Sequence, residues 1–488
     1  MDTRAPRWRT VYRDLRDAVV SGALAPGTRL PSTRAHAEAL GVSRNTVLAA
    51  YEQLTAEGYV EARVGAGTFV VGQPSPPVSA SEAAEAASAS APVSAFARRA
   101  VASRPGTPYR DAGLPYDFRY GRVPPEIGLA GRWRRLLAGT SAPLDYGDAA
   151  GYLPLRRSLA GYLRRRRGVR VDPDDVIVTT GSQQALDLLA RVLLDPGDGV
   201  LLEDPAYQGA RQVFTANGAQ LHPMPVDAEG ARLPEAIPER VRLAYVTPSH
   251  QFPTGVVLSF ARRQALLASA ERHGYWIVED DYDAEFRYDV RPVPALQGID
   301  AAGRVAYVGT FSKVLFPALR LGYAVAPPAL REALLAAKWL ADRHTATIEQ
   351  AAMAELIDSG RFERHLAAAR RLHAQRRAAL VTSLAGHFGR SAHVMGTSTG
   401  VHALVRHPDL PSDRTAALVR SAGERGVGLY PSTPYYLGSS PAMAELVVGY
   451  GALEPDAIRA GVARWAAAYG QLAPGGFHEP EYGSVQRS

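Results

Sequence analysis

The strongest constraint on the fold is a break in composition between residues 72 and 112. The stretch GQPSPPVSASEAAEAASASAPVSA, which begins at Gly72, is rich in alanine, serine and proline and has almost no large apolar side chain. Such a segment cannot bury enough apolar surface to offset the conformational entropy that folding removes. We therefore expect a flexible linker over 72–112, between a head at 1–71 and a body at 113–473. We expect residues 474–488 to form a disordered tail.

The composition excludes several classes of protein. The 488 residues include no cysteine, which excludes disulfides and cysteine-bound zinc. No apolar run is long enough to span a membrane, and the first residues lack the continuous apolar core of a signal peptide. The formal net charge of +7 is compatible with nucleic-acid binding but does not establish it. A cytoplasmic protein is the simplest interpretation.

The head has the pattern of a helix-turn-helix followed by a hairpin. Apolar residues at helical spacing over 8–19 predict a first helix, and the glycines and prolines of 22–31 end it. TRAHAEAL, 33–40, predicts a short second helix, and Ser43 is placed to cap a third. The inward stripe of that third helix is expected at Val47, Leu48, Tyr51 and Leu54. YVEARV and TFVV around a GAG tip predict a β-hairpin.

The segment LPSTRAHAEALGVSRNTVLAAYEQLTAEGYVEARVGAGTFV, 30–70, resembles the winged-helix DNA-binding domain of the GntR family along its whole length. The resemblance implies that the helix starting near Arg44 enters the major groove and that the wing reaches a neighbouring groove. The implied DNA-binding residues are Arg34, Ser43, Arg44, Asn45, Thr46, Arg63 and Gly65. Each arginine alone could equally be an ordinary solvated charge, but the complete pattern favours DNA binding.

The body alternates apolar strands with amphipathic segments such as 259–273. Candidate strands are VIVT (176–179), VLLE (200–203), LAYVT (243–247), YWIVED (275–280), VAYVGT (305–310) and LGYAVA (321–326). This alternation predicts an α/β fold, a mostly parallel sheet with helices on both faces. Ligands of such sheets sit beyond the carboxyl ends of the strands, so the polar residues at those ends form the candidate site.

Four polar groups follow the predicted strands. They are Ser182 and Gln183 in TTGSQQAL, Tyr207 in DPAYQG, Asp280 in VEDDYDAEF, and a last group of Thr310 and Ser312 in GTFSK with Arg320, which follows that motif. A helix start with free N–H groups, hydroxyls and an arginine suit a phosphate, and a tyrosine on a loop can stack on a flat ring. Each group alone is more often structural: a turn, a cap, a solvated charge or a core tyrosine.

Lys313 lies among these groups, in a chain whose positively charged side chains are almost all arginines. Of 55 lysines and arginines, only Lys313 and Lys338 are lysine. An amine can form a Schiff base with an aldehyde, whereas a guanidinium stays protonated and is weakly nucleophilic. A planar ring with a phosphate, an aldehyde and a basic nitrogen that faces a carboxylate is pyridoxal phosphate (PLP). The residues therefore predict PLP as cofactor.

The body resembles the fold-type I aminotransferases over roughly residues 113–470, through the ordered motifs YGDAAGYLPLR, TTGSQQAL, DPAYQG, TPSHQFPTG, EDDYDAEF and GTFSKVLFPALRLGY. With the winged helix and linker, the chain resembles the MocR/GabR family of regulators. The resemblance implies a small C-terminal α+β domain beside the large one, and a homodimer in which Tyr146 reaches the neighbouring subunit's site. Its implied cofactor contacts are Lys313 by Schiff base, Asp280 on the ring nitrogen, Tyr282 on the ring hydroxyl, Tyr207 by stacking, and Ser182, Gln183, Thr310, Ser312 and Arg320 on the phosphate.

Three positions depart from the aminotransferase pattern. Phe252 stands before Pro-Thr-Gly, where aminotransferases usually carry an asparagine that binds the ring hydroxyl. Val447, in ELVVGYG, stands where they usually hold the substrate carboxylate with an arginine. Gly209 stands where relatives that sense γ-aminobutyrate use an arginine. The first two changes weaken the case for transamination, and the last two weaken the case for γ-aminobutyrate as effector.

Three functions remain open from the sequence. The leading one is a PLP-dependent transcriptional regulator that binds promoter DNA with paired half-sites, modulated by PLP or by an amine that reacts with the bound PLP. One branch of the resembled family controls vitamin B6 synthesis genes. The second is an active aminotransferase with an accessory DNA-binding head. The third is a DNA-binding protein whose body only dimerises.

Overall fold

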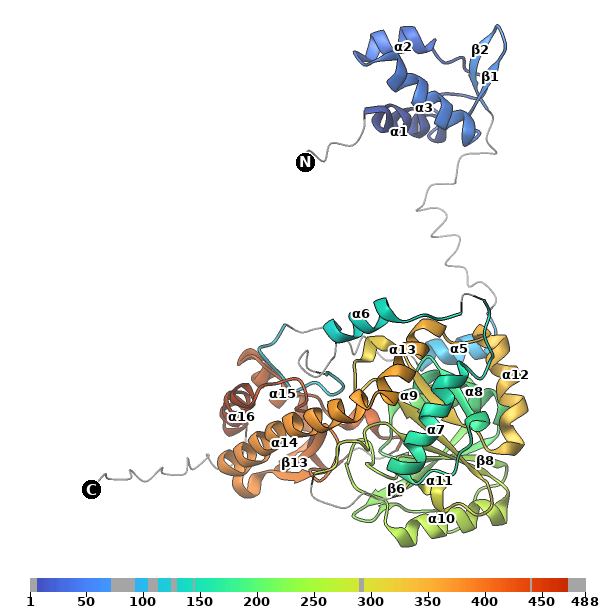
Figure 1. The fold of residues 1–488 in the computed structure, drawn as a ribbon. Helices are drawn as coiled ribbons and strands as arrows, with labels where there is room; N and C mark the ends of the chain where they lie inside the picture. The colour runs from blue at the N-terminus through green and yellow to red at the C-terminus, as the bar shows by residue number, and fades with distance from the viewer. Residues whose placement is uncertain are drawn as a thin grey trace. The chain divides into compact units, whose positions relative to one another are not determined.

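The computed structural model describes residues 7–71, 93–103, 113–123, 130–143, 145–288, 294–438 and 441–472. It divides into two compact units, 1–93 and 94–488, which correspond to the head and the body (Figure 1). The predicted tail at 474–488 and most of the predicted linker, 72–92 and 104–112, lie outside the described residues.

The head is a winged helix. Its elements are α1 (Arg7–Val20), α2 (Thr33–Leu40), α3 (Arg44–Ala56), β1 (Val60–Arg63) and β2 (Gly67–Val70). Ser43 caps α3, since its side chain accepts a hydrogen bond from the backbone N–H of Thr46. The strands pair antiparallel around Gly65, whose φ of 74° suits a glycine at the wing tip.

The predicted inward stripe of α3 is wrong at one position. Val47, Tyr51 and Leu54 are buried, but Leu48 is 38% exposed and Ala50 is buried in its place. Successive residues of a helix turn by about 100°, so a side chain next to Val47 points well away from the i, i+3, i+4, i+7 face. Leu48 therefore lies on the outer surface of α3.

The body contains an 8-stranded sheet in the order β4-β11-β10-β9-β8-β5-β6-β7. The strands are β4 (Val176–Thr179), β5 (Gly199–Asp204), β6 (Gln220–Asp227), β7 (Gly230–Ala231), β8 (Val241–Val246), β9 (Trp276–Asp281), β10 (Val305–Thr310) and β11 (Gly322–Val325). Neighbouring strands from β10 to β6 pair parallel, whereas β11 and β7 run antiparallel to their neighbours. The prediction of a mostly parallel sheet is confirmed.

Helices cover both faces of the sheet (Figure 1). They are α7 (Leu153–Arg167), α8 (Ser182–Leu193), α9 (Gln208–Ala216), α10 (Phe260–His273), α11 (Leu296–Ile299), α12 (Arg331–Asp342) and α13 (Thr347–Asp358), with α6 (Ala130–Gly139) before them. Alternate residues of one strand enter different cores: Tyr245 packs with α8 and α9, and Ala244 and Val246 pack with α10. This alternation follows from the period of two in a strand.

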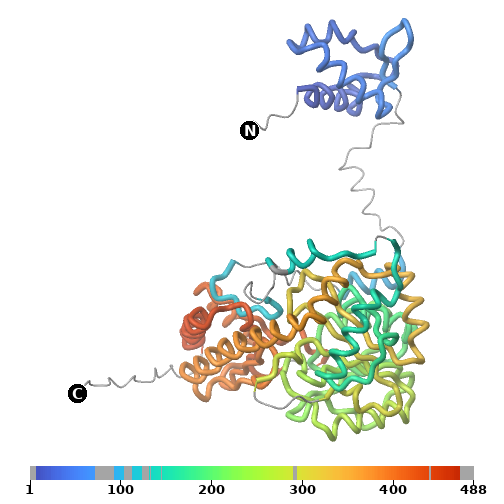
Figure 2. The backbone as a smooth tube through the Cα atoms, in the orientation of Figure 1, coloured from blue at the N-terminus to red at the C-terminus, as the bar shows by residue number. Residues whose placement is uncertain are grey.

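The small domain combines C-terminal and N-terminal parts of the body. An antiparallel sheet of β12 (His393–Met395), β13 (His402–Pro411) and β15 (Met443–Gly449) packs with α14 (Arg361–Phe388), α15 (Thr415–Glu424) and α16 (Pro455–Gly470). The early strand β3 (Tyr116–Asp117) pairs with β14 (Val427–Gly428), so an early segment of the body lies in the small domain (Figure 2). The expected α+β domain is present but is not purely C-terminal.

One helix forms inside the segment predicted as a linker. Residues 95–102, AFARRAVA, form α5 (Ala95–Ala102), and Ser94 caps it by accepting from the N–H of Ala97. Alanine is the best helix former, so this part of an Ala/Ser-rich stretch can be helical once it has a surface to pack on. Among the described helices, none is both long and apolar enough to cross a membrane.

Candidate functional site

Lys313 follows β10 and lies in a pocket of aromatic and acidic side chains. Its Nζ is 4.5 Å from the ring centroid of Tyr120, and a Cβ at Gly121 would lie only 3.1 Å from it. Burial lowers the pKa of the Lys313 amine to about 8, against the opposing attraction of Asp283 and Asp280. A lowered pKa leaves more of the amine neutral near pH 7, as a nucleophile requires.

Asp280, at the end of β9, has a carboxylate oxygen without a partner. Its Oδ2 accepts from the hydroxyl of Tyr245 at 2.8 Å, while the buried Oδ1 has no hydrogen bond. Burial raises the pKa of Asp280 to about 7. A buried carboxylate with a free oxygen is a ready acceptor for a cationic N–H.

Side chains alternate between the two faces of a strand, and this alternation explains which of the three acids 279–281 faces Lys313. Asp281 points to the opposite face of the sheet, where its Oδ2 accepts from Arg167 Nε at 2.7 Å and from the Tyr307 hydroxyl at 2.6 Å. Glu279, on that same face, accepts from two backbone N–H groups of α11. Of these three acids, only Asp280 lies on the face of the sheet that carries Lys313.

Tyr282 joins a buried polar network that the sequence did not predict. Its hydroxyl donates to the carbonyl of His250 at 2.8 Å and lies 3.1 Å from His250 Nδ1, which also contacts the Asp283 carboxylate at 2.9 Å. His402 packs beside His250, with ring centroids 4.7 Å apart, and burial holds the pKa of its imidazole well below the usual value. The predicted partner of Tyr282, a ring hydroxyl, would compete with the His250 carbonyl.

The group His250, Asp283 and His402 offers three possible metal-ligand atoms within 4.8 Å of one another. His250 Nδ1 bonds Asp283, and His402 Nε2 donates to the carbonyl of Pro253 at 3.1 Å, while His250 Nε2 and His402 Nδ1 are buried without a hydrogen bond. The Lys313 amine lies close enough to repel a proton on His402, and would repel a metal cation in the same way. Within this group, His250 and Asp283 form a hydrogen-bonded support for Tyr282.

The residues predicted for a phosphate meet at the start of α8. Gly181, with a φ of 112°, precedes Ser182, and a Cβ at Gly181 would lie 2.8 Å from the guanidinium of Arg320. Thr310 and Ser312 are linked by a hydrogen bond of 3.0 Å between their hydroxyls. Free N–H groups at the helix start, an arginine and two hydroxyls form a cradle suited to a phosphate.

Tyr207, Gln183 and Gly209 form a tight group at the start of α9. Gln183 Nε2 donates to the carbonyl of Gly209 at 3.1 Å. A Cβ at Gly209 would lie 2.5 Å from the Tyr207 ring and 2.6 Å from Gln183 Oε1. Position 209 therefore holds a glycine for steric reasons, and an arginine there would displace Tyr207.

Phe252 occupies the centre of an aromatic cluster. Its ring centroid lies 4.8 Å from that of Tyr120, 5.1 Å from Tyr435 and 6.0 Å from Tyr207. Val447 is buried in β15, and its backbone N–H donates to the carbonyl of Tyr430. Neither side chain can bind a carboxylate.

Tyr146 is not brought into this group within one chain. It is 75% exposed, stacks edge-on against His344 and lies under the Arg343 guanidinium. A cavity of about 670 Å³ lies beside it, lined by the loop 140–146, His344 and the start of α13. Its predicted contact with a cofactor would need a second subunit.

These residues fit PLP. The orphaned oxygen of Asp280 suits a protonated ring nitrogen, Tyr207 offers a face for the ring, and the start of α8 offers the phosphate cradle. When bound, PLP supplies an aldehyde that reacts with an amine and a ring that withdraws electrons. Tyr120, Gly121, Tyr245 and His250 were missed from the sequence, because no local pattern ties them to Lys313.

The predicted DNA contacts lie at the starts of α2 and α3 and on the wing. Arg34, Arg44 and Asn45 are exposed, and Arg44 Nε is 3.4 Å from the Thr33 hydroxyl. Arg63 donates to Glu61 at 2.7 Å and covers the ring of Phe69, so a contact with a phosphate would have to replace that ion pair. The Ser43 hydroxyl is engaged as the cap of α3.

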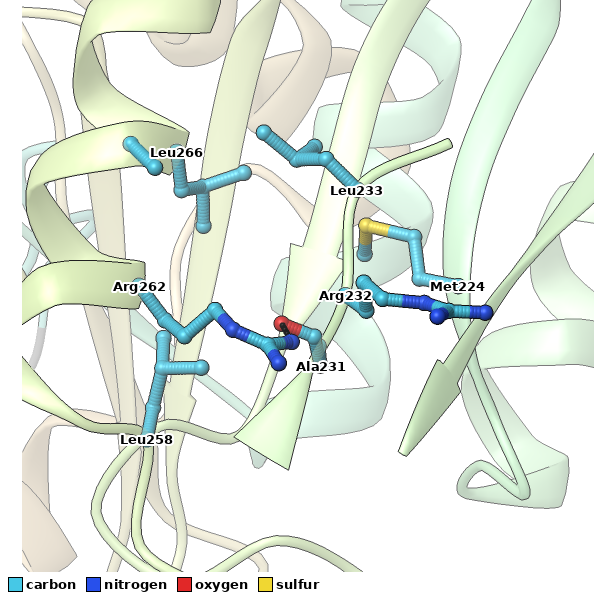
Figure 3. Close-up of a pocket in the computed structure, with 8 residues that line it drawn as sticks. Met224, Ala231, Arg232, Leu233, Leu258, Arg262 and Leu266 are labelled. Carbon is cyan, nitrogen blue, oxygen red and sulfur yellow. Dashed lines mark hydrogen bonds between the residues drawn. The ribbon is translucent and has the colours of Figure 1, made fainter. Parts of the chain in front are cut away.

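A separate small cavity of about 190 Å³ lies between β6, β7 and α10 (Figure 3). Leucines, Met224 and alanines form its walls, with Arg232 and Arg262 at its side. Arg262 is engaged by the Ala231 carbonyl and by Asp227. None of its lining residues belongs to the group around Lys313.

Two family models match the chain. "Bacterial regulatory proteins, gntR family" matches residues 8–70, and "Aminotransferase class I and II" matches residues 121–441. LysN, the α-aminoadipate aminotransferase of Thermus thermophilus solved with N-(5'-phosphopyridoxyl)-L-leucine, superposes with a TM-score of 0.69 at 31% identity over 81% of this chain and 99% of its own. Pyrococcus horikoshii kynurenine aminotransferase, solved with PMP, gives 0.65 at 29% identity over 72% and 90%. PLP is accordingly the cofactor of the body.

Fold and site together define a transcriptional regulator with a DNA-binding GntR-type head and a PLP-binding, aminotransferase-like body. Its relatives have the same organisation: the probable rhizopine catabolism regulatory protein MocR of Rhizobium meliloti is 38% identical over 94% of this chain and 93% of its own. The pyridoxine biosynthesis regulator PdxR of Corynebacterium glutamicum is 31% identical over 91% and 92%. The chain belongs to the MocR family of PLP-dependent transcriptional regulators.

Proposed function

We propose that the chain is a PLP sensor, in which PLP bound at Lys313 changes the affinity of the head for promoter DNA. The observation that carries this proposal is the combination of a group around Lys313 that fits PLP with two positions, one for a substrate carboxylate and one for γ-aminobutyrate, that lack the expected arginine. Lys313 has a pKa lowered to about 8, and Asp280 has a free oxygen for the ring nitrogen. Val447 and Gly209 occupy the two arginine positions.

Three other arginines of the body are already engaged in ion pairs. Arg406 of β13 pairs with Glu445 of β15, and Arg119 and Arg122 both pair with Asp117. A free amino acid that bound its carboxylate to one of these three arginines would have to break its ion pair. PLP, which brings its own phosphate to the cradle at α8, needs none of them. Control of vitamin B6 synthesis genes follows as the target class, as the name of the relative PdxR also indicates.

We assign the individual roles as follows. Lys313 attaches PLP, Asp280 binds the ring nitrogen, Tyr282 the ring hydroxyl, and Tyr207 stacks on the ring. Ser182, Gln183, Thr310, Ser312 and Arg320 bind the phosphate. Arg34, Ser43, Arg44, Asn45, Thr46, Arg63 and Gly65 contact DNA.

The proposed working form is a cytoplasmic homodimer. Exposed Tyr146, Trp339, Leu340 and Ile348 come from α12, α13 and the loop before α7. Exposed apolar groups of this kind are typical of an interface between subunits. Tyr146 would then complete the neighbouring site, and a two-fold dimer favours paired half-sites in the operator.

A second candidate function is transamination, which the Lys313–Asp280 pair alone would support. The test is to load the protein with PLP, add amino acids one at a time, and follow the absorbance of the pyridoxamine form together with the oxo acid released. Repeated turnover would establish an enzyme. A single turnover or none, with DNA affinity that changes on adding PLP alone, is the result we expect.

A further inference from the structure

Helix α5 is the first element of the body after the linker, and little holds it in place. It has eight residues, none of them fully buried. Phe96 and Val101 are 40% and 75% exposed. A helix this short is not stable alone in water, so α5 depends on its contacts with the rest of the body. Elements with so little burial are those that dock and undock easily.

Arg99 anchors α5 to α9. Its Nε donates to the carbonyl of Ala216, the last residue of α9, at 3.0 Å. Its guanidinium also lies over Gly218, where a Cβ would come within 3.2 Å of Nη2. Gly218 has a φ of 90°, so the turn after α9 both requires a glycine and leaves room for the arginine.

The other end of α9 lies in the cofactor site. Tyr207, the residue proposed to stack on the ring, is the cap residue of α9, and the carbonyl of Gly209 is bound by Gln183. At about 1.5 Å per residue, α9 is a rod of roughly 13 Å that connects this end to Ala216. The Tyr207 ring packs directly on Gly209 in the first turn of α9, since a Cβ there would lie 2.5 Å from it.

Helix α9 is also tied to the small domain. Gln208 Nε2 donates to the carbonyl of Pro434 at 3.0 Å, and Arg211 Nη1 donates to the carbonyl of Tyr436 at 2.9 Å. The N–H of Ala206, just before the helix, donates to the carbonyl of Tyr435 at 2.9 Å. A movement of the small domain toward the cofactor would therefore be transmitted to α9 through these hydrogen bonds.

We propose that Arg99 is a positioning residue that couples α9, and through it the cofactor site, to the segment leading to the head. This inference rests on the proposed function and specifies how it is regulated. PLP bound against Tyr207 sets the position of α9. The position of α9 decides whether the Ala216 carbonyl can accept the hydrogen bond from Arg99. When this bond forms, α5 is docked on the body, and when it breaks, α5 is released. The docked state fixes where the linker leaves the body, which changes the reach of the head toward paired half-sites.

The test uses hydrogen–deuterium exchange of the peptide that contains residues 94–103, in the full-length protein with and without PLP. We expect PLP to change exchange in this peptide at least about threefold in the wild type and not in Arg99→Ala. Val101→Ala, at a side chain of the same helix that is 75% exposed, is the control and should behave as the wild type. Arg99→Lys, which keeps a donor, should restore part of the response. The absorbance of bound PLP checks that each variant still loads the cofactor.

DNA affinity, measured on the same samples by fluorescence anisotropy, separates this inference from the proposed function. The coupling factor is the ratio of the DNA affinities measured with and without PLP. Such factors are commonly about 5- to 150-fold, and for Arg99→Ala we expect the two affinities to differ by less than about twofold. If PLP shifts DNA affinity equally in the wild type and in Arg99→Ala, the coupling role is wrong while the sensor stands. If PLP does not change exchange in wild-type α5, the coupling role is wrong, and the sensor stands only if PLP still shifts the DNA affinity of the wild type. If α5 responds to PLP but DNA affinity does not, the coupling stands and the sensor is wrong.

Discussion

Replacing Asp280 with asparagine should stabilise the PLP-free protein and weaken PLP binding at the same time. Asp280 is 4% exposed, and only one of its oxygens has a donor. Burial raises its pKa from an ordinary 3.8 to about 7. Asparagine keeps an acceptor for the Tyr245 hydroxyl and carries no charge, so it removes the penalty of ionising this group without changing the shape of the site.

The magnitude follows from the two pKa values. Between pH 3.8 and about 7, the unfolded chain has lost the proton of Asp280 while the folded chain still holds it. The free energy of unfolding therefore falls as the pH rises, by about 1.4 kcal/mol per pH unit, or about 4 kcal/mol over the interval, and is flat above it. The free energy of unfolding of Asp280→Asn, relative to that of the wild type, should therefore be about 3 kcal/mol higher at pH 8 than at pH 5.

Urea unfolding of both proteins without PLP, at pH 5 and pH 8, measures this difference, and PLP titration at pH 8 measures the affinity. A charge-assisted hydrogen bond contributes about 1.5–3 kcal/mol, so PLP should bind about 10- to 100-fold more weakly. Glu279→Gln is the matched control: Glu279 is also buried with a pKa near 7 but faces away from the site, so PLP affinity should not change. If the variant gains nothing between pH 5 and pH 8, or binds PLP as tightly as the wild type, the reasoning is refuted.

Three further predictions concern the ligand cradle and the head. Gly209→Ala places a Cβ 2.5 Å from the Tyr207 ring and should weaken PLP binding at least about tenfold with the circular dichroism spectrum unchanged; unchanged affinity would contradict the stacking role. Arg320→Ala should weaken binding of PLP about 10- to 100-fold but that of pyridoxal, which lacks the phosphate, less than about threefold; equal losses would contradict a phosphate role. Ser43→Ala should lower the free energy of unfolding of the head by about 1 kcal/mol and weaken DNA binding, whereas Leu48→Ala, on an exposed side chain, should change the unfolding free energy by less than about 0.5 kcal/mol.

The architecture could be predicted because its signals are local. TRAHAEAL and the strands over 176–179 and 305–310 occur with the predicted bounds, since periodicity, glycine punctuation and capping act over a few residues. The mostly parallel order of the sheet follows from the alternation of strands and helices. The exposure of Leu48 shows where a count of apolar residues fails, because helix geometry decides the face.

The parts that could not be predicted depend on long-range contacts. Tyr120 meets Lys313 because β3 crosses to pair with β14, and Tyr245 reaches Asp280 from the neighbouring strand. His250 supports Tyr282 through its backbone carbonyl, which carries no sequence signal. Composition alone suggests a linker at 95–102, yet the Ala216 carbonyl and Arg99 hold a helix there.

We propose that a cofactor attached to Lys313 controls DNA binding. The most direct measurement is fluorescence anisotropy with DNA from upstream of the protein's own gene, using wild type and Lys313→Ala, each stripped of PLP and then titrated with it. The account predicts that PLP shifts the Kd of the wild type at least about fivefold and leaves that of Lys313→Ala unchanged. A wild-type Kd that PLP does not move, or an equal shift in both proteins, would contradict it.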